Sequence, residues 1–187
     1  MKIGSAMLGM LFVVPALAHA SGDAGPVSQK LGPDVRIALP GELQLRSYPM
    51  PIPGASNYRI DTGSMRIAIT GIPLDMGGGP PAAPRSDDKM KEGTLRSAAQ
   101  YRAGAANPDA APSLVKGEGW AATYVTYAAK AGEAGFVPFM GAAYQCVSTG
   151  EVATARTVFI LTVGSADCAG GEHQDFLKAL ETITVEG

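Results

Sequence analysis

The sequence has 187 residues, with 15 Lys and Arg against 17 Asp and Glu and a formal net charge of −2 at pH 7. This balance gives no electrostatic basis for a nucleic-acid partner, because such proteins carry a clustered excess of basic residues. A chain near 150 residues buries about 68–70% of its unfolded surface, so one domain with a substantial core accounts for the length.

The first twenty residues have the three-part pattern of a secretory signal peptide. Met1-Lys2 gives a positive start, residues 3–17 form an apolar run, and Ala18-His19-Ala20 is a small-residue cleavage pattern. The alternative is a membrane anchor. The run is interrupted by Gly and Pro and is shorter than the roughly 20 residues that span a bilayer, so we predict a signal peptide over residues 1–20.

The chain after the signal divides into two parts. Residues 21–34 are rich in Gly, Ser, Asp and Pro and have no periodic pattern, which predicts a flexible lead-in. Residues 35–187 should form a single domain. Export places this domain in the periplasm or outside the cell, with no membrane span after signal cleavage.

Alternating apolar residues predict two hairpins in the first half of the domain. The first joins residues 35–39 to 43–46, and the second joins 57–61 to 64–72. Residues 73–84 contain three consecutive glycines and several prolines, a composition that fits neither a helix nor an interior strand. We therefore expect a long loop there.

A helix is predicted to begin after Ser86. A hydroxyl N-cap followed by Asp87-Asp88 satisfies free amides and opposes the positive end of the helix dipole. A modest apolar stripe carries this helix to about residue 102. Residues 104–119 then have the composition of a second loop, and residues 120–129 that of a strand.

The centre of the sheet is predicted to be a long antiparallel hairpin. Its arms are residues 136–149 and 156–163, separated by a turn at Gly150-Glu151, and the second arm is rich in β-branched residues. Helical spacing of apolar residues follows over residues 172–182, and residues 183–185 can form a last short strand.

These elements predict an α+β fold with a mostly antiparallel sheet of about six or seven strands and two helices packed on a face. Strand and helix do not alternate regularly, which disfavours a parallel three-layer fold. The order of strands, helices and loops is similar to that of the small α+β sandwiches of the PsbP and Mog1 type. The similarity is one of architecture only, with no diagnostic motif.

One short motif suggests catalysis. Asp61-Thr62-Gly63, followed by Ser64, resembles the active-site loop of aspartic proteases, in which two such aspartates share a proton and activate water. A single copy implies a homodimer of the retroviral-protease kind. The favoured alternative is a hairpin turn, in which Asp61 bonds the nearby backbone and Gly63 takes a positive φ.

Cys146 and Cys168 are the two cysteines of the chain. An even number in an oxidising compartment predicts a disulfide, and the alternative is a free, buried Cys146. Cys168 and His173 could also offer ligands to a divalent ion, but the recognised zinc spacings are missing. The segment is equally typical of a polar loop and a helix start. We therefore predict no metal and no cofactor.

The leading hypothesis is a non-enzymatic, exported binding or protein-interaction domain. It would act as an inhibitor or immunity-type protein, or as an accessory factor of the envelope, with another exported protein or a small ligand as its partner. The first alternative is a homodimeric aspartic protease that uses Asp61. The second is a small metal-handling protein that uses Cys168 and His173.

Overall fold

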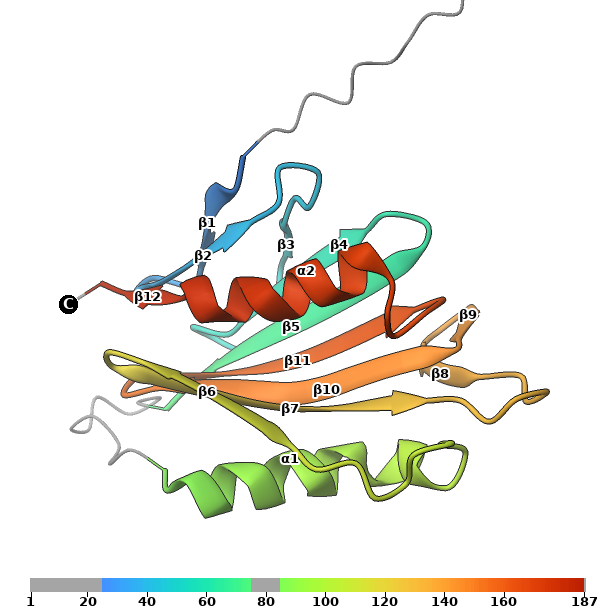
Figure 1. Cartoon of the computed structure of the whole chain (residues 1–187). Coiled ribbons are helices and arrows are strands. Elements are labelled where there is room, and N and C mark those ends of the chain that lie inside the picture. The colour runs from blue at the N-terminus through green and yellow to red at the C-terminus, as the bar shows by residue number, and fades with distance from the viewer. Residues whose placement is uncertain (1–24, 75–84, 187) are drawn as a thin grey trace, which may run out of the picture.

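The computed structural model describes residues 25–74 and 85–186. The predicted signal peptide over residues 1–20 and nearly all of the predicted loop over residues 73–84 lie outside these ranges. The described chain forms one domain with a seven-stranded antiparallel sheet, two small sheets and two helices (Figure 1). The predicted α+β class, the mostly antiparallel sheet and the two helices are confirmed. No helix in the described ranges is long and apolar enough to cross a membrane.

The main sheet has its longest strands at its centre. In spatial order its strands are β3 (Arg46–Tyr48), β4 (Ser56–Asp61), β5 (Met65–Pro73), β11 (Thr157–Ser165), β10 (Cys146–Thr154), β7 (Trp120–Ala128) and β6 (Ser113–Gly117). β10 and β11 form the central hairpin, as the sequence predicts. Since successive side chains of a strand point to opposite faces, each strand contributes to two separate surfaces.

One face of the sheet is covered by the C-terminal helix and a small sheet. The covering elements are α2 (Gly171–Ala179), the 3₁₀ turn η1 (Leu180–Thr182), β1 (Val27–Leu31), β2 (Val35–Leu39) and β12 (Thr184–Val185). In Figure 1 they lie on the side of the sheet away from the other helix. The larger core forms here, and its fully buried side chains include Leu31, Ile37, Ile67, Phe159, Leu161, Phe176 and Leu180.

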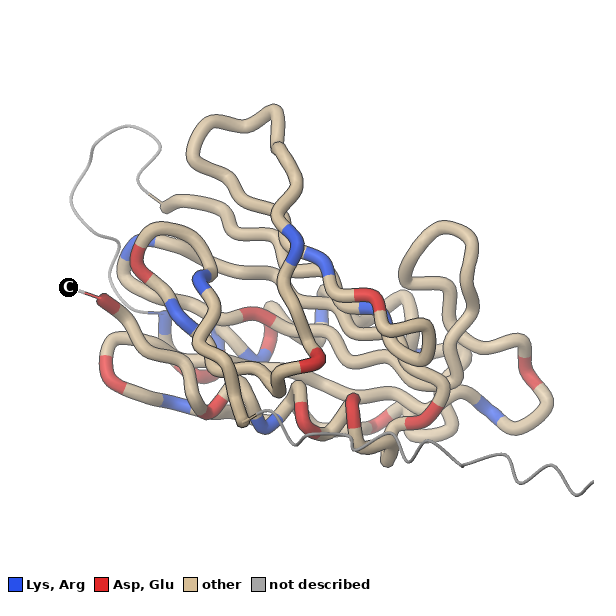
Figure 2. Tube along the Cα trace, turned by 90° about the horizontal axis from the view of Figure 1, so that it is seen from above, with Lys and Arg blue, Asp and Glu red and all other residues tan. Residues whose placement is uncertain are grey.

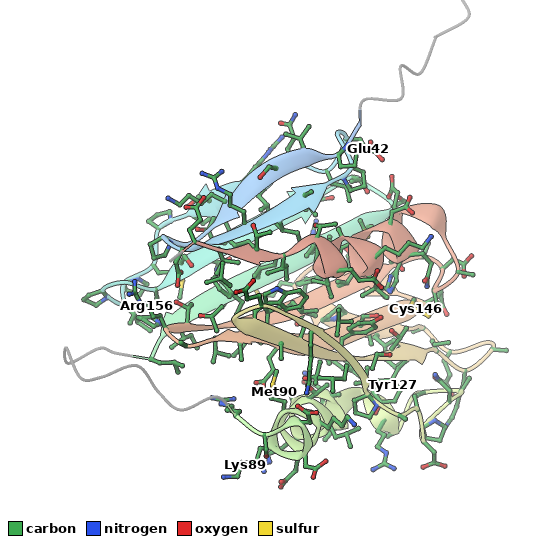
Figure 3. All side chains as sticks on the ribbon, turned by 60° about the vertical axis from the view of Figure 1, so that its left-hand side comes forward. Glu42, Lys89, Met90, Tyr127, Cys146 and Arg156 are labelled. Carbon is green, nitrogen blue, oxygen red and sulfur yellow. A yellow bond between two sulfur atoms is a disulfide. The ribbon has the colours of Figure 1, made fainter. Side chains whose placement is uncertain are left out.

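The opposite face is covered only in part, by α1 (Asp87–Arg102). The Ser86 hydroxyl accepts a hydrogen bond from the amide of Lys89, which confirms the predicted N-cap. Met90 points from α1 toward the sheet and Lys89 points away (Figure 3). The helix packs on β6, β7 and β10. On the same face, Ile160 of β11 is 41% exposed, so the half of this face that contains β3, β4, β5 and β11 is open.

A short hairpin closes one end of this open half. The first predicted arm of the long hairpin is interrupted, because β8 (Phe136–Phe139) and β9 (Ala142–Tyr144) pair with each other before β10 begins. The ring of Tyr144 lies against Gly164, where an added Cβ would come within 2.7 Å of it. The small residue therefore allows the hairpin to sit directly on the sheet.

The predicted turn at Gly150-Glu151 is wrong. β10 continues through both residues to Thr154, and the chain reverses at residues 155–156. A Cβ on Gly150 would collide with the backbone carbonyl of Thr123 on β7. The glycine therefore allows β10 and β7 to approach each other closely and does not form a turn.

Three smaller predictions about the edges also fail. Within the expected flexible lead-in, residues 27–31 form β1, which is ordered by backbone pairing with β2 although most of its side chains are exposed. Within the expected loop over residues 104–119, residues 113–117 form the edge strand β6. The predicted hairpin between residues 35–39 and 43–46 does not form, because β2 pairs with β1 and β12 while β3 joins the main sheet.

Candidate functional site

The open half of the sheet carries an unusual set of polar side chains. β3 and β4 pair so that Arg46 lies opposite Arg59 and Tyr48 opposite Asn57. β4 and β5 pair so that Arg59 lies opposite Ala68 and Asp61 opposite Arg66. The intervening residues Ile60, Ile67 and Ile69 point to the other face and join the larger core. We call the seven outward residues the open sheet face: Arg46, Tyr48, Asn57, Arg59, Asp61, Arg66 and Ala68.

A cavity of about 410 Å³ lies over this face. Asn57, Arg59 and Ala68 contribute to its floor, while Phe139 and Met140 contribute from the β8–β9 hairpin. Met140 is 96% exposed, although methionine is an apolar side chain. Sites for small ligands usually measure about 300–1,000 Å³ and combine apolar walls with a few polar groups, so this cavity has a suitable size and lining.

The open sheet face is basic in a protein of opposite net charge, and two of its three arginines, Arg59 and Arg66, line the cavity. Acidic and basic positions are interleaved over most of the trace in Figure 2, consistent with the net charge of −2. The open sheet face instead holds three arginines and one aspartate, a net charge of +2. This local excess favours a ligand that carries negative charge.

Two of the arginines are held by specific contacts. Arg66 donates from Nε to Asp61 Oδ2 at 2.8 Å, and its guanidinium carbon lies 6.0 Å from the centre of the Phe139 ring. The guanidinium carbon of Arg59 lies 4.8 Å from the centre of the Tyr48 ring, an arrangement that is stabilised by cation–π attraction. Neither Arg46 nor Arg59 forms an ion pair with any carboxylate in residues 25–74 or 85–186.

Asp61 lies at the start of a turn, as the turn interpretation predicts. Its Oδ1 accepts a hydrogen bond from the amide of Gly63 at 3.2 Å, and Gly63 has a φ of +88°. The hydrogen bond from Arg66 holds the pKa of the Asp61 carboxyl below its usual value, with a further contribution from the Gly63 amide. The ionised form is thus favoured, whereas a protease dyad needs two carboxyls that share a proton.

Asp61→Asn should leave the fold intact and lower the free energy of unfolding by about 1 kcal/mol or less. The ion pair to Arg66 is exposed and contributes little, and Asn can still accept from the Gly63 amide. Urea unfolding of both proteins measures the difference, and peptide hydrolysis at acidic pH is assayed alongside. Hydrolysis by the parent that is lost in the variant would contradict the turn interpretation and support the aspartic-protease hypothesis.

The structure joins Cys146 and Cys168 in a disulfide, with their α-carbons 5.1 Å apart (Figure 3). Cys168 therefore supplies no thiolate to a metal. His173 belongs to α2 and is buried, with Nδ1 2.8 Å from Ser165 Oγ and Nε2 2.8 Å from Ser148 Oγ. The described ranges contain no group of three or more His, Cys, Asp and Glu placed to hold a metal. The two candidate ligands are therefore near each other in sequence but are not arranged as a metal site.

His173 instead completes a buried hydrogen-bond chain. Ser165 Oγ donates to the carbonyl of Asp167, so it can accept from Nδ1–H of the imidazole. Ser148 can then donate to Nε2 and accept from the hydroxyl of Thr126 at 2.6 Å. This assignment, inferred from the network, satisfies a neutral imidazole. Burial lowers the pKa of His173 from 6.5 to about 4, which favours the same neutral form.

A second cavity, of about 480 Å³, lies near the start of α1. Trp120, Met90 and Val158 contribute apolar surface to it. Its charged side chains are already paired, Arg85 with Glu151 and Lys116 with Asp87. It therefore offers a ligand less free charge than the cavity over the open sheet face.

Among the residues that line the cavity, Asp61 is the one that a sequence motif identified. Alternation along residues 57–61 and 64–72 could have placed Arg59, Asp61 and Arg66 on one face. The pairing of β3 with β4 and the position of the β8–β9 hairpin have no comparable local signal, because both depend on contacts between distant segments. Tyr48, Phe139 and Met140 were missed for that reason.

A scan against protein-family models found no match, and a search of curated proteins found none either.

Proposed function

We propose that this chain is an exported, non-enzymatic binding domain whose recognition site is the cavity over the open sheet face. The observation that carries the proposal is the combination of Arg59, Arg66, Tyr48 and Phe139 around one cavity of about 410 Å³. Three of these side chains come from paired strands, which hold binding groups more firmly than loops do. The cavity thus has the size, the charge and the rigid support of a ligand site.

The N-terminal pattern and the cysteines together support an exported location. Residues 1–20 have the sequence of a signal peptide, and a disulfide is typical of oxidising compartments. Within the envelope or outside the cell, such a domain would serve as an inhibitor or immunity-type protein or as an accessory factor. Protein recovered from the envelope fraction should begin at Ser21, and an uncleaved cytoplasmic chain would contradict export.

The enzymatic and metal alternatives have weaker support. Asp61 is held in an ion pair with Arg66, and His173 of α2 is buried with both ring nitrogens hydrogen-bonded. A general acid or base must reach its substrate, and His173 is only 1% exposed. A binding function without catalysis therefore fits the side chains of this protein better than a protease or a metal-handling function does.

The proposal is tested by mapping binding on isotope-labelled protein with NMR. Addition of an envelope extract should shift amide resonances of β3, β4 and β5 and of residues 139–141. Ala68→Phe places a large ring on the cavity floor and should abolish these shifts. Ala99→Phe, the same change at an exposed position of α1, should leave them intact. The proposed binding site would be refuted if the amide resonances of the open sheet face did not shift, or if they still shifted in the Ala68→Phe variant.

A further inference from the structure

Two arginines on the open sheet face are placed where they repel each other. Arg46 and Arg59 occupy directly opposed positions of β3 and β4. Side chains at such positions have Cβ atoms about 4.5–5.5 Å apart, and like charges there destabilise the strand pair. The neighbouring carboxylate of Asp61 is already bound by Arg66. An anion shared by the two arginines would offset this repulsion.

The guanidinium of Arg59 is held in place for such an anion. Its position 4.8 Å from the centre of the Tyr48 ring restricts the side chain while leaving it exposed. Arginine binds carboxylates and phosphates through two parallel hydrogen bonds, which makes a fixed guanidinium a specific receptor. The first requirement of the site is therefore an oxyanion.

A further feature restricts the rest of the ligand. Phe139 and Met140 line the same cavity with apolar surface. The ligand should thus carry an apolar group close to its oxyanion, and a free phosphate has none.

We propose that the cavity binds the C-terminal residue of a peptide. The terminal carboxylate pairs with Arg59, and Arg46 adds its charge from the opposed position. An apolar side chain packs against Phe139 and Met140. This inference rests on the proposed function and names the ligand class of the same site.

A matched pair of dipeptides tests the inference. N-acetyl-Gly-Phe with a free carboxylate is titrated into the labelled, purified protein, and the same dipeptide with a C-terminal carboxamide is the control. The free acid should bind at the open sheet face, and the carboxamide should bind about 10- to 100-fold more weakly, as expected for the loss of a charged hydrogen bond. Arg59→Gln should weaken the free acid by a similar factor.

Arg96→Gln provides the control for removal of a charge. Arg96 is exposed on α1 and pairs with Glu92, so this variant should bind the free acid as the parent does. The inference is overturned if the acid and the carboxamide bind equally, if Arg59→Gln has no effect, or if inorganic phosphate binds as tightly as the acid. If the dipeptide fails while envelope extract still shifts the cavity resonances, the ligand class is wrong and the proposed function stands. If neither the dipeptide nor the envelope extract shifts these resonances, the proposed ligand class and the proposed function are both wrong.

Discussion

Lowering the pH from 6.5 toward 4 should destabilise the protein, and a His173→Gln variant should lose stability less steeply over the same range. The pKa of His173 is about 4 in the folded protein and 6.5 in the unfolded chain. Between these values the unfolded chain binds a proton that the folded protein does not. Falling pH therefore favours unfolding, and the stability contribution is fully present above pH 6.5.

The expected effect is large for a single side chain. The difference between the two pKa values corresponds to about 3 kcal/mol over the whole window, or at most about 1.4 kcal/mol per pH unit. The side chain is almost fully buried, so solvent screening reduces this figure little. Protonation of His173 would also require the hydrogen bonds to Ser148 and Ser165 to rearrange, because both ring nitrogens would then be donors.

Urea unfolding at several pH values between 7 and 5 measures this effect. The His173→Gln variant should be less stable than the parent at pH 7, because it disturbs a buried hydrogen-bond chain. Its free energy of unfolding should nevertheless fall less with pH, since no imidazole remains to take up the proton. The upper part of the window is the most informative, because carboxylates begin to titrate closer to pH 4. Parallel curves for parent and variant would show that His173 does not control acid stability.

Much of the fold could be predicted because several local signals are strong. The N-cap at Ser86 and the β-branched run over residues 157–163 each determine an element with little help from the rest of the chain. Gly150 shows the limit of this approach. A glycine beside a glutamate has the composition of a turn, but its role is set by the neighbouring strand β7, which the local sequence does not contain.

Asp61 is the one residue of the candidate site that a sequence motif singled out, and it did so through a resemblance to proteases that the structure does not support. The Asp61-Thr62-Gly63 motif suggests a catalytic carboxylate, whereas the structure places Asp61 in a turn and in an ion pair with Arg66. The charge of the open sheet face arises from register between strands. Arg46 and Arg59 are 13 positions apart in the sequence and become neighbours only when β3 pairs with β4. Such pairings depend on the whole fold.

Reduction of the disulfide between Cys146 and Cys168 should lower the free energy of unfolding by about 3 kcal/mol. The two cysteines are separated by 22 positions, and closing a loop of that length restricts the unfolded chain by about this amount in the chain-entropy model. The register explains why the bond forms. Cys146 lies opposite Ser165 at the end of the central hairpin, so Cys168 follows only three residues beyond that position.

Thermal unfolding with and without a reductant is the measurement. For a protein of this size about 3 kcal/mol corresponds to a fall of roughly 10 °C in Tm. Cys146 is fully buried but Cys168 is partly exposed, so a reductant can reach the bond from one side. A Cys146→Ala/Cys168→Ala variant should melt near the reduced parent and should not respond to the reductant. Two freely titrating thiols in the native, oxidised protein, or a Tm that is unchanged by reduction, would contradict this prediction.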